Sequence, residues 1–339
     1  MTIRKRVIAL LYVWALYVSL FVGLAELSAD GPLVIAHRGA SGYVPEHTLE
    51  AKAMAHAMGA DFIEQDVVLS KDDVPVVLHD IHLDTVTNVA EVFPERARDD
   101  GRYYAIDFTL AEIKELNATE RINLKTGKAY YPKRFPARQS NFSVPTLAEE
   151  IELIQGLNIS TGREAGIYPE IKNPAFHRKE GKDISKIVID TIGRYGYKTK
   201  QDKCFVQCFD IKETKRIRNE LRCQTRIVQL TGGVGYKKIL SREGLKELAK
   251  YADGIGPSLS SVLALVDGKM NVKPLVADAH AAGLVVHPYT LRADEVPSGF
   301  ESYRQMVQVV FGDAQVDGAF TDFPDKTIAA IETLSGSRD

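Results

Sequence analysis

Short apolar runs alternate with amphipathic stretches along the chain from Leu33 onward. Helical patterns such as HTLEAKAMAHAMG and EGLKELAKYA separate these runs, and alternation of this kind predicts parallel strands joined by helices. The eight runs are LVIAHRG, DFIEQDVV, GIYPEIK, KCFVQCF, TRIVQL, DGIGP, LVVHPYT and GAFTDFP. Eight strands of this type predict an α/β fold, a (β/α)8 TIM barrel, whose chemistry collects at the carboxyl ends of its strands.

A doubly wound open sheet is the alternative fold. In such a sheet the ligand binds at one switch point of the strand order. Here polar residues lie near the ends of many of the predicted strands. This distribution favours the barrel.

The segment VPVVLHD, residues 74–80, does not fit the alternation. Only a turn at Asp72 and Asp73 separates it from the preceding apolar run, without a crossover helix. The two segments are therefore predicted to form an antiparallel β-hairpin after the second barrel strand. A turn centred between Asp72 and Asp73 places His79 opposite Asp66, so the hairpin is expected to return an imidazole toward that strand.

Residues from about 81 to 143 interrupt the alternation for longer. Charged residues and tyrosines dominate in FPERARDDGRYYAIDFT and KTGKAYYPKRFPARQS, with a helix-like LAEIKEL between them. Barrel loops lengthen at the catalytic face to cover a site, so we expect a small inserted cap region here. Its polar composition offers no continuous apolar wall for an acyl chain.

The first 29 residues have a composition of their own. Arg4, Lys5 and Arg6 precede an apolar run over residues 7–25, and the polarity changes at Glu26. This order is typical of a secretory signal peptide and predicts a periplasmic or secreted protein. The run is also close to the length of a spanning helix, so an uncleaved membrane anchor is the alternative. Residues 30–339 are then the catalytic domain.

The composition and net charge of the chain bear on the kind of molecule that it can bind. The chain has 339 residues, 45% of them hydrophobic, and a formal net charge of −2. Because nucleic-acid binding usually requires a basic face, no nucleic-acid partner is expected. The cysteines Cys204, Cys208 and Cys223 lack the spacing of a metal site and are expected to be buried thiols. The sequence does not indicate an oligomeric state.

Ionisable residues lie inside strands that are otherwise typical of a buried sheet. Glu64 and Asp66 are two residues apart and point to one side of their strand, as Glu170 and Lys172 do on the next barrel strand. Three neighbouring carboxylates would raise one another's pKa. A divalent cation removes this conflict, and oxygen ligands favour Ca²⁺ or Mg²⁺ over zinc. For any one acid alone, an outward position or an ion pair is the alternative.

The segment VIAHRGASG supplies the complementary groups. His37 and Arg38 end the first predicted strand, and Gly39 and Gly42 let the backbone bend and present amide hydrogens to an anion. Together with His79, Lys172 and the inferred cation, these residues predict a site for a phosphate ester. Its two imidazoles would act as base and acid.

The same segments resemble a known family. VIAHRGASGYVPEHTLEA, ADFIEQDVVLSKDDVPVVLHD and YPEIK are similar to the glycerophosphodiester phosphodiesterases, particularly to the periplasmic or secreted branch with an insertion after the His-Asp pair. The resemblance extends from Leu33 to GAFTDFPDK. It implies a (β/α)8 barrel that hydrolyses a small glycerophosphodiester to an alcohol and sn-glycerol 3-phosphate with one divalent cation, Ca²⁺ in first place and Mg²⁺ as the alternative.

The resemblance also implies roles for individual residues. It assigns acid-base catalysis to His37 and His79, substrate binding to Arg38 and Lys172, and metal ligation to Glu64, Asp66 and Glu170. It does not decide which histidine is the acid, or whether water or a glycerol hydroxyl attacks phosphorus.

The chain departs from the usual pattern of that family in two places. His47 stands where many members have asparagine, and TGGVGYKKILSREG is short for a loop that bears on the choice of alcohol. Two other functions remain open. A lysophospholipase D or phospholipase C-like phosphodiesterase would need an apolar rim, and a non-catalytic exported binding protein on the same fold should have lost a histidine or a carboxylate.

Overall fold

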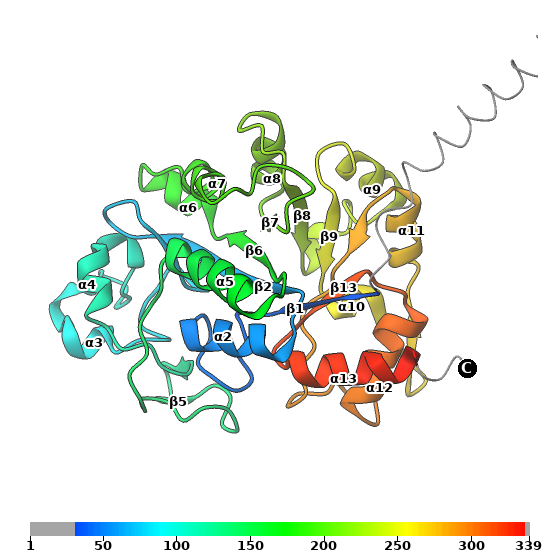
Figure 1. The fold of residues 1–339 in the computed structure, drawn as a ribbon, viewed down its shortest axis with the longest axis horizontal. Coiled ribbons are helices and arrows are strands. Elements are labelled where there is room, and N and C mark those ends of the chain that lie inside the picture. Colours follow the sequence, from blue (N-terminus) through cyan, green and yellow to red (C-terminus); the bar gives the residue numbers. More distant parts are fainter. Residues whose placement is uncertain (1–30, 336–339) are drawn as a thin grey trace, which may run out of the picture. The chain divides into compact units, whose positions relative to one another are not determined.

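The computed structural model describes residues 31–335. Within this range eight parallel strands form one sheet in the order β12-β9-β8-β7-β6-β2-β1-β13. The strands are β1 (Leu33–Ala36), β2 (Phe62–Leu69), β6 (Gly166–Ile171), β7 (Phe205–Cys208), β8 (Arg226–Thr231), β9 (Gly254–Pro257), β12 (Val285–Val286) and β13 (Gly318–Thr321). Figure 1 shows them at the centre of the molecule.

The two ends of this strand order meet beyond β12. The Leu291 amide donates a hydrogen bond to the Phe320 carbonyl at 2.8 Å, and Leu291 forms a parallel bridge with Thr321. The sheet is therefore a nearly closed barrel, as the sequence predicts. The doubly wound alternative is wrong.

Helices connect the strands and cover the outside of the barrel (Figure 1). The longer ones are α2 (Leu49–Met58), α5 (Leu147–Thr161), α7 (Ile184–Arg194), α8 (Ile211–Asn219), α9 (Arg242–Leu248), α11 (Leu275–Ala281) and α13 (Pro324–Ser335). Shorter elements are α6 (Pro174–Lys179), η4 (Val234–Tyr236), α10 (Leu259–Val262), the hairpin β10 (Leu263–Val266) and β11 (Lys269–Val272), α12 (Tyr303–Gln308), and η5 (Val309–Asp313). Within residues 31–335, no helix has the length and hydropathy needed to cross a membrane.

Local sequence explains where the helices next to the site begin and end. The Thr48 side chain caps α2 by accepting from the Ala51 amide, and Gly59 ends the helix with φ 101°. Thr146 and Glu149 form a reciprocal capping box at the start of α5. These caps fix the two helices that pack behind β2.

The inside of the barrel is a packed layer of side chains. Its buried apolar members are Ile35, Phe62, Tyr168, Phe205, Val228 and Phe320. The hydroxyl of Tyr168 lies 2.9 Å from Nδ1 of His287, so even the polar atoms of this layer are paired. Because the interior is filled, a substrate can reach only the carboxyl ends of the strands.

The predicted hairpin is present, with a register one residue from that expected. Strand β3 (Pro75–Val77) pairs antiparallel with the end of β2. The Leu78 amide donates to the Asp66 carbonyl at 2.8 Å, so Leu78, not His79, lies opposite Asp66. The turn is centred on Asp72, because Asp73 adopts a left-handed conformation with φ 62°.

The inserted segment, residues 81–143, packs beside the hairpin around an apolar cluster of its own. This cluster includes Leu83, Phe108, Ile113 and Phe142 together with Val76 of β3. Its elements are α3 (Val89–Val92), η2 (Pro94–Arg96), η3 (Ala105–Asp107), α4 (Leu110–Lys114), β4 (Ile122–Asn123) and β5 (Lys128–Ala129). The helix expected in LAEIKEL is α4, whereas the domain boundaries at 30, 81 and 143 stay a prediction.

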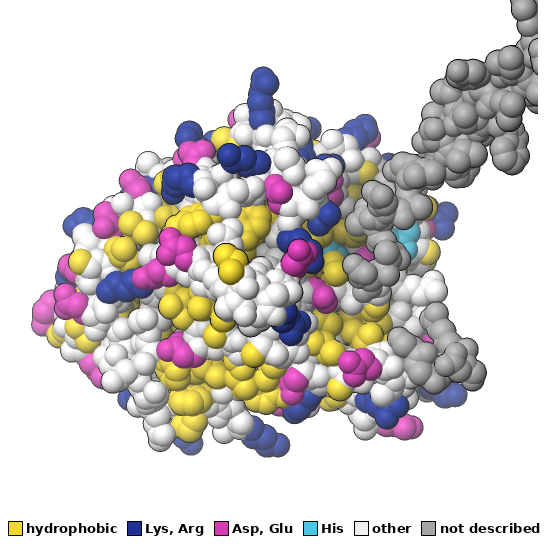
Figure 2. All heavy atoms as spheres, in the orientation of Figure 1, with side chains coloured by type: hydrophobic (Ala, Val, Ile, Leu, Met, Phe, Trp, Pro, Cys, Tyr) yellow, Lys and Arg dark blue, Asp and Glu magenta, His cyan; other side chains and the backbone are white. Residues whose placement is uncertain are grey.

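Two other expectations concern the cysteines and the surface. Cys204, Cys208 and Cys223 are free and buried, as expected. On the face shown in Figure 2, lysine and arginine side chains are interspersed with aspartate and glutamate rather than gathered into one patch. The proposed signal peptide or anchor at 1–29 lies outside the described residues.

Candidate active site

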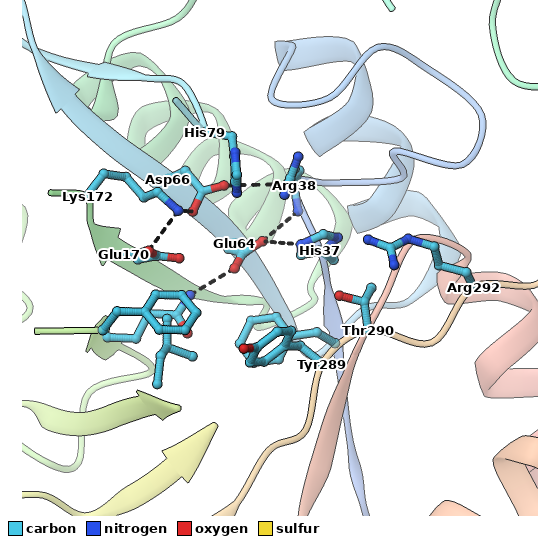
Figure 3. Close-up of a pocket in the computed structure, with 14 residues that line it drawn as sticks. His37, Arg38, Glu64, Asp66, His79, Glu170, Lys172, Tyr289, Thr290 and Arg292 are labelled. Atoms are coloured by element: carbon cyan, nitrogen blue, oxygen red, sulfur yellow. Dashed lines mark hydrogen bonds and ion pairs between the residues drawn. The ribbon is translucent and has the colours of Figure 1, made fainter. Parts of the chain in front are cut away.

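Three carboxylates meet at the carboxyl ends of β2 and β6. The parallel register places Asp66 beside Glu170 and Glu64 beside Tyr168. Glu64, Asp66 and Glu170 are all buried, and each offers one oxygen within 4.8 Å of the others. Figure 3 shows their side chains grouped at one cavity. The predicted convergence of these acids is therefore present.

The pKa values of the three carboxylates are shifted in different directions. Burial raises the pKa of Glu170 well above its usual value, and burial together with Asp66 raises the pKa of Glu64. Burial also opposes ionisation of Asp66, but Lys172 and His47 outweigh it and hold the pKa of Asp66 well below its usual value. Among the described residues, buried Asp66 Oδ1 has no hydrogen-bond partner. Oxygen donors in this state fit a hard divalent cation.

Two cationic side chains border the carboxylate cluster. Lys172 Nζ lies 2.8 Å from Glu170 Oε1 and 3.6 Å from Asp66 Oδ1. Arg38 donates its amide to Glu64 Oε2 at 2.9 Å, and its Nε lies 3.5 Å from Asp66 Oδ2. Both residues thus stand where an anionic group entering the cavity would meet them.

The glycines after Arg38 serve packing, and their own amides are bonded within the protein. That the backbone after them presents amides to an anion stays a prediction. The Gly39 amide donates to the Ala36 carbonyl at 3.2 Å, and the Gly42 amide donates to the Asp322 carbonyl at 2.9 Å. Gly39 has φ 86°, and a Cβ there would lie 2.8 Å from the Ala51 backbone. Close approach of α2, rather than ligand binding, requires this glycine.

His37 is held by an aspartate from the far end of the chain. Its Nδ1 lies 2.5 Å from Asp322 Oδ1. The other oxygen of Asp322 accepts from Arg134 at 2.7 Å and from Arg292 at 2.9 Å. Because Nδ1 is bonded to Asp322, Nε2 is left facing the carboxylate cluster, 3.9 Å from Glu64 Oε2.

His79 has a similar arrangement. Its Nδ1 lies 2.7 Å from Asp80 Oδ1, and Asp80 Oδ2 accepts from Arg121 at 2.6 Å. Burial and the charges of Arg38 and Lys172 lower the pKa of His79 to about 4. This imidazole is therefore neutral near pH 7 and able to accept a proton.

Two arginines of the inserted segment, which were not among the predicted site residues, hold the acidic partners of the histidines. Arg121 bridges Asp80 and Glu46, with its Nη2 2.6 Å from Glu46 Oε1, and Glu46 in turn accepts from Arg38 at 2.9 Å. Arg134 binds Asp322 and Asp294. Both proposed catalytic histidines therefore contact an aspartate through Nδ1. Each of these aspartates in turn accepts a hydrogen bond from an arginine of the inserted segment.

A buried polar chain behind β2 was also missed. His47 Nε2 lies 2.8 Å from Asp66 Oδ2, and Lys52 Nζ lies 3.1 Å from His47 Nδ1. Lys52 donates to this nitrogen, so His47 carries its proton on Nε2 and donates it to Asp66. Lys52 is 0% exposed and pairs with the buried Glu150 at 3.1 Å. The available signal was a lysine close to Ala51 and Ala55, two apolar positions of α2 that are buried.

Replacing Lys52 with methionine should destabilise the fold by about 3 kcal/mol, because three buried groups, His47 Nδ1, the Glu64 carbonyl and the Glu150 carboxyl, would lose the ammonium group that bonds them. Burial already raises the pKa of Glu150 to about 8, and Lys52 opposes this rise. Urea unfolding would measure the loss, with the exposed partner in Lys186–Asp190 as control: Lys186→Met should change stability by about 0.5 kcal/mol or less. Equal effects of the two substitutions would contradict the assignment.

The cavity above the carboxylate cluster has a volume of about 250 Å³. Both predicted histidines, both predicted cations and all three acids line it (Figure 3). Further lining residues that sequence reasoning did not find are Gln207, Leu230, Thr290 and Arg292. Gln207 donates to Glu64 Oε1 at 2.8 Å and thereby orients that carboxylate.

Comparison with a family model and with related proteins indicates one and the same family. Residues 37–326 match the model of the glycerophosphoryl diester phosphodiesterase family. A glycerophosphodiester phosphodiesterase of Haemophilus influenzae is 42% identical over 330 residues, 90% of either chain, and one of Treponema pallidum is 36% identical over 93% of this chain and 96% of its own.

Two solved structures share the fold. A putative glycerophosphoryl diester phosphodiesterase from Silicibacter pomeroyi has a TM-score of 0.69 at 24% identity and covers 91% of this chain and 95% of its own. A phosphodiesterase of Oleispira antarctica, in complex with the product sn-glycerol-3-phosphate, has a TM-score of 0.61 at 22% identity and covers 89% and 97%.

Proposed function

The chain belongs to the glycerophosphoryl diester phosphodiesterase family and is a phosphoric diester hydrolase, and on this premise we propose that it cleaves glycerophosphodiesters to an alcohol and sn-glycerol 3-phosphate by histidine acid-base catalysis with a divalent cation. The observation that carries the proposal is the pairing of two imidazoles with one carboxylate cluster. His37 and His79 both line the cavity above Glu64, Asp66 and Glu170. Such a set can bind a phosphate ester and move its protons.

The protons can be followed through the reaction. The attacking oxygen, from water or from a glycerol hydroxyl, forms a bond to phosphorus, and the bond between phosphorus and the alcohol oxygen breaks. Attack by the glycerol hydroxyl gives a cyclic phosphate, which water then opens to glycerol 3-phosphate. One imidazole takes the proton of the attacking oxygen and the other gives a proton to the departing alkoxide. Their Nδ1 contacts with Asp322 and Asp80 keep Nε2 of each ring available for this work.

The acidic and basic side chains of the cavity would bind the cation and the phosphoryl oxygens. Glu64, Asp66 and Glu170 would hold the cation, which supplies Lewis-acid polarisation of the phosphoryl group when bound. Arg38 and Lys172 would bind the phosphoryl oxygens and stabilise the charge that grows on them. We propose Ca²⁺ in first place and Mg²⁺ as the alternative, because Ca²⁺ accepts irregular shells of oxygen ligands whereas Mg²⁺ demands a near-ideal octahedron.

We expect purified protein to hydrolyse glycerophosphocholine and to discriminate against lysophosphatidylcholine. Arg38, Lys172 and Arg292 line the cavity, so an acyl tail there would meet charged groups instead of a continuous apolar wall. Competition kinetics with both substrates measures the difference, with glycerol 3-phosphate as the product of the first diester and lysophosphatidic acid or monoacylglycerol as the product of the lysolipid. A preference for the lysolipid would replace this proposal by the phospholipase function, and absence of turnover on any diester would leave a non-catalytic binding protein.

The site of action is a separate proposal. The basic and apolar order of residues 1–29 supports export to the periplasm or secretion, with retention as a membrane anchor as the alternative. Apart from such an anchor, the partner that we propose is the small-molecule diester alone.

A further inference from the structure

A second cavity adjoins the one that holds the carboxylate cluster. It has a volume of about 430 Å³, against about 250 Å³ for the first. The two share part of their walls, namely His79, Glu170, Lys172 and Phe209. A diester whose phosphate lies beside Glu170 and Lys172 can therefore extend one arm into each cavity.

The size and the walls of the first cavity suit the glycerol arm. Tyr289 and Phe320 provide an apolar surface for its carbon atoms, while Thr290 and Arg292 offer polar groups for its hydroxyls. The alcohol arm is then directed to the larger second cavity.

The second cavity combines aromatic rings with acidic groups. Phe176, Phe209 and Tyr236 line it, and the rings of Phe209 and Tyr236 lie 6.5 Å apart at 63°. Asp80 and Asp210 line it as well. Aromatic faces beside carboxylates are the chemistry that recognises organic cations, including quaternary ammonium groups.

The positive charges around this cavity are largely committed elsewhere. In the described part of the chain, Lys172 is the one lysine or arginine in its wall, and it lies 2.8 Å from Glu170. Asp80 is bound by Arg121. Asp210 Oδ1 accepts two amides at the start of α8, whereas Oδ2 makes only a long contact with Arg178, at 4.0 Å. Asp210 is thus the carboxylate with the most charge left for a ligand.

We propose that the second cavity binds the alcohol arm of the diester and favours a cationic alcohol, an amino or quaternary ammonium alcohol. The proposal rests on the phosphodiesterase function and adds a preference to it. The cation would lie against the rings of Phe176 and Tyr236, with Asp210 as its counter-charge, because the Phe209 ring already faces the Lys172 ammonium group at 6.0 Å.

The test compares kcat/KM for glycerophosphocholine and glycerophosphoethanolamine with kcat/KM for glycerophosphoglycerol, which lacks the cation. One cation–π contact with a nearby carboxylate corresponds to a preference of about 5-fold to 10-fold for the cationic diesters. Equal values for all three diesters would overturn the inference while leaving the proposed function intact. Hydrolysis of none of them would overturn the proposed function itself.

Asp210→Asn provides the sharper measurement. Asparagine also caps helices, so the variant keeps the start of α8 and loses the charge. We expect the preference for the cationic diesters to fall about 3-fold, and choline to become a weaker competitive inhibitor at constant ionic strength. Phe176→Leu, which removes one ring, should change the preference in the same direction.

Asp183→Asn is the matched control. Asp183 caps α7 by accepting from the Lys186 amide at 3.1 Å and lines neither cavity. Its substitution should leave the ratio between cationic and neutral diesters unchanged. If Asp183→Asn and Asp210→Asn shift the ratio equally, the second cavity has no part in selecting the alcohol.

Discussion

Treatment with EDTA is expected to lower hydrolysis of glycerophosphocholine by about 1,000-fold or more, since a metal ion typically supplies several kcal/mol of charge stabilisation. The expectation follows from the burial of Glu64, Asp66 and Glu170 within 4.8 Å of one another, with the pKa of Glu170 raised and that of Asp66 lowered. Added Ca²⁺ should restore activity, and Mg²⁺ should restore less. Activity that survives exhaustive chelation would refute the cation site.

A binding measurement separates the cation from its catalytic effect. Calorimetric titration of metal-free protein with Ca²⁺ should show one site, and Glu170→Gln should weaken it while keeping the shape of the side chain. Glu164→Gln is the control, because the Glu164 side chain is 81% exposed and far from the three acids in its contacts. Unchanged Ca²⁺ affinity in Glu170→Gln would remove that residue from the site.

Each of His37→Ala and His79→Ala should lose about 100-fold or more in kcat, the usual contribution of a positioned proton donor or acceptor. The double variant should lose much less than the product of the two, because both groups act in one reaction. Steady-state kinetics with glycerophosphocholine measures the loss, and circular dichroism reports whether the fold is kept.

His280→Ala serves as the control for the histidine variants. His280 lies on α11, is half exposed, and pairs with Asp317 away from the cavity. Its substitution should leave kcat unchanged. A near-normal kcat in either His37→Ala or His79→Ala would exclude that residue from proton transfer.

The parts of the site that the sequence predicts are those that follow from chain periodicity. Residues two apart on a strand share a side, so Glu64 and Asp66 could be placed together from their spacing alone, and parallel pairing brought Glu170 beside them. The alternation of strands and helices predicted the barrel for the same reason. These features depend on local order and on one general rule of topology.

The arginines that were missed make contacts between distant segments. Arg134 and Asp322 are 188 residues apart, and Arg121 and Asp80 are 41 apart. No periodicity relates them, so these arginines looked like ordinary charges of a polar loop. The partner of the Gly42 amide is equally distant, because the Asp322 carbonyl follows the last barrel strand. The hairpin register, by contrast, depends on a local feature, the left-handed conformation of Asp73.

Arg121 and Arg134 of the inserted segment bind Asp80 and Asp322, the aspartates that contact the two imidazoles, so the insertion supports the geometry of the barrel's site. Trimming residues 81–143 to obtain a minimal enzyme would keep every residue that lines the two cavities. Asp80 would nevertheless lose Arg121, and Asp322 would keep only Arg292 of its two arginine partners, so both imidazoles would be held less firmly. Transplanting the carboxylate cluster onto a bare barrel would meet the same obstacle. Changes to the insertion that are meant to alter the choice of diester should therefore leave Arg121 and Arg134 in place.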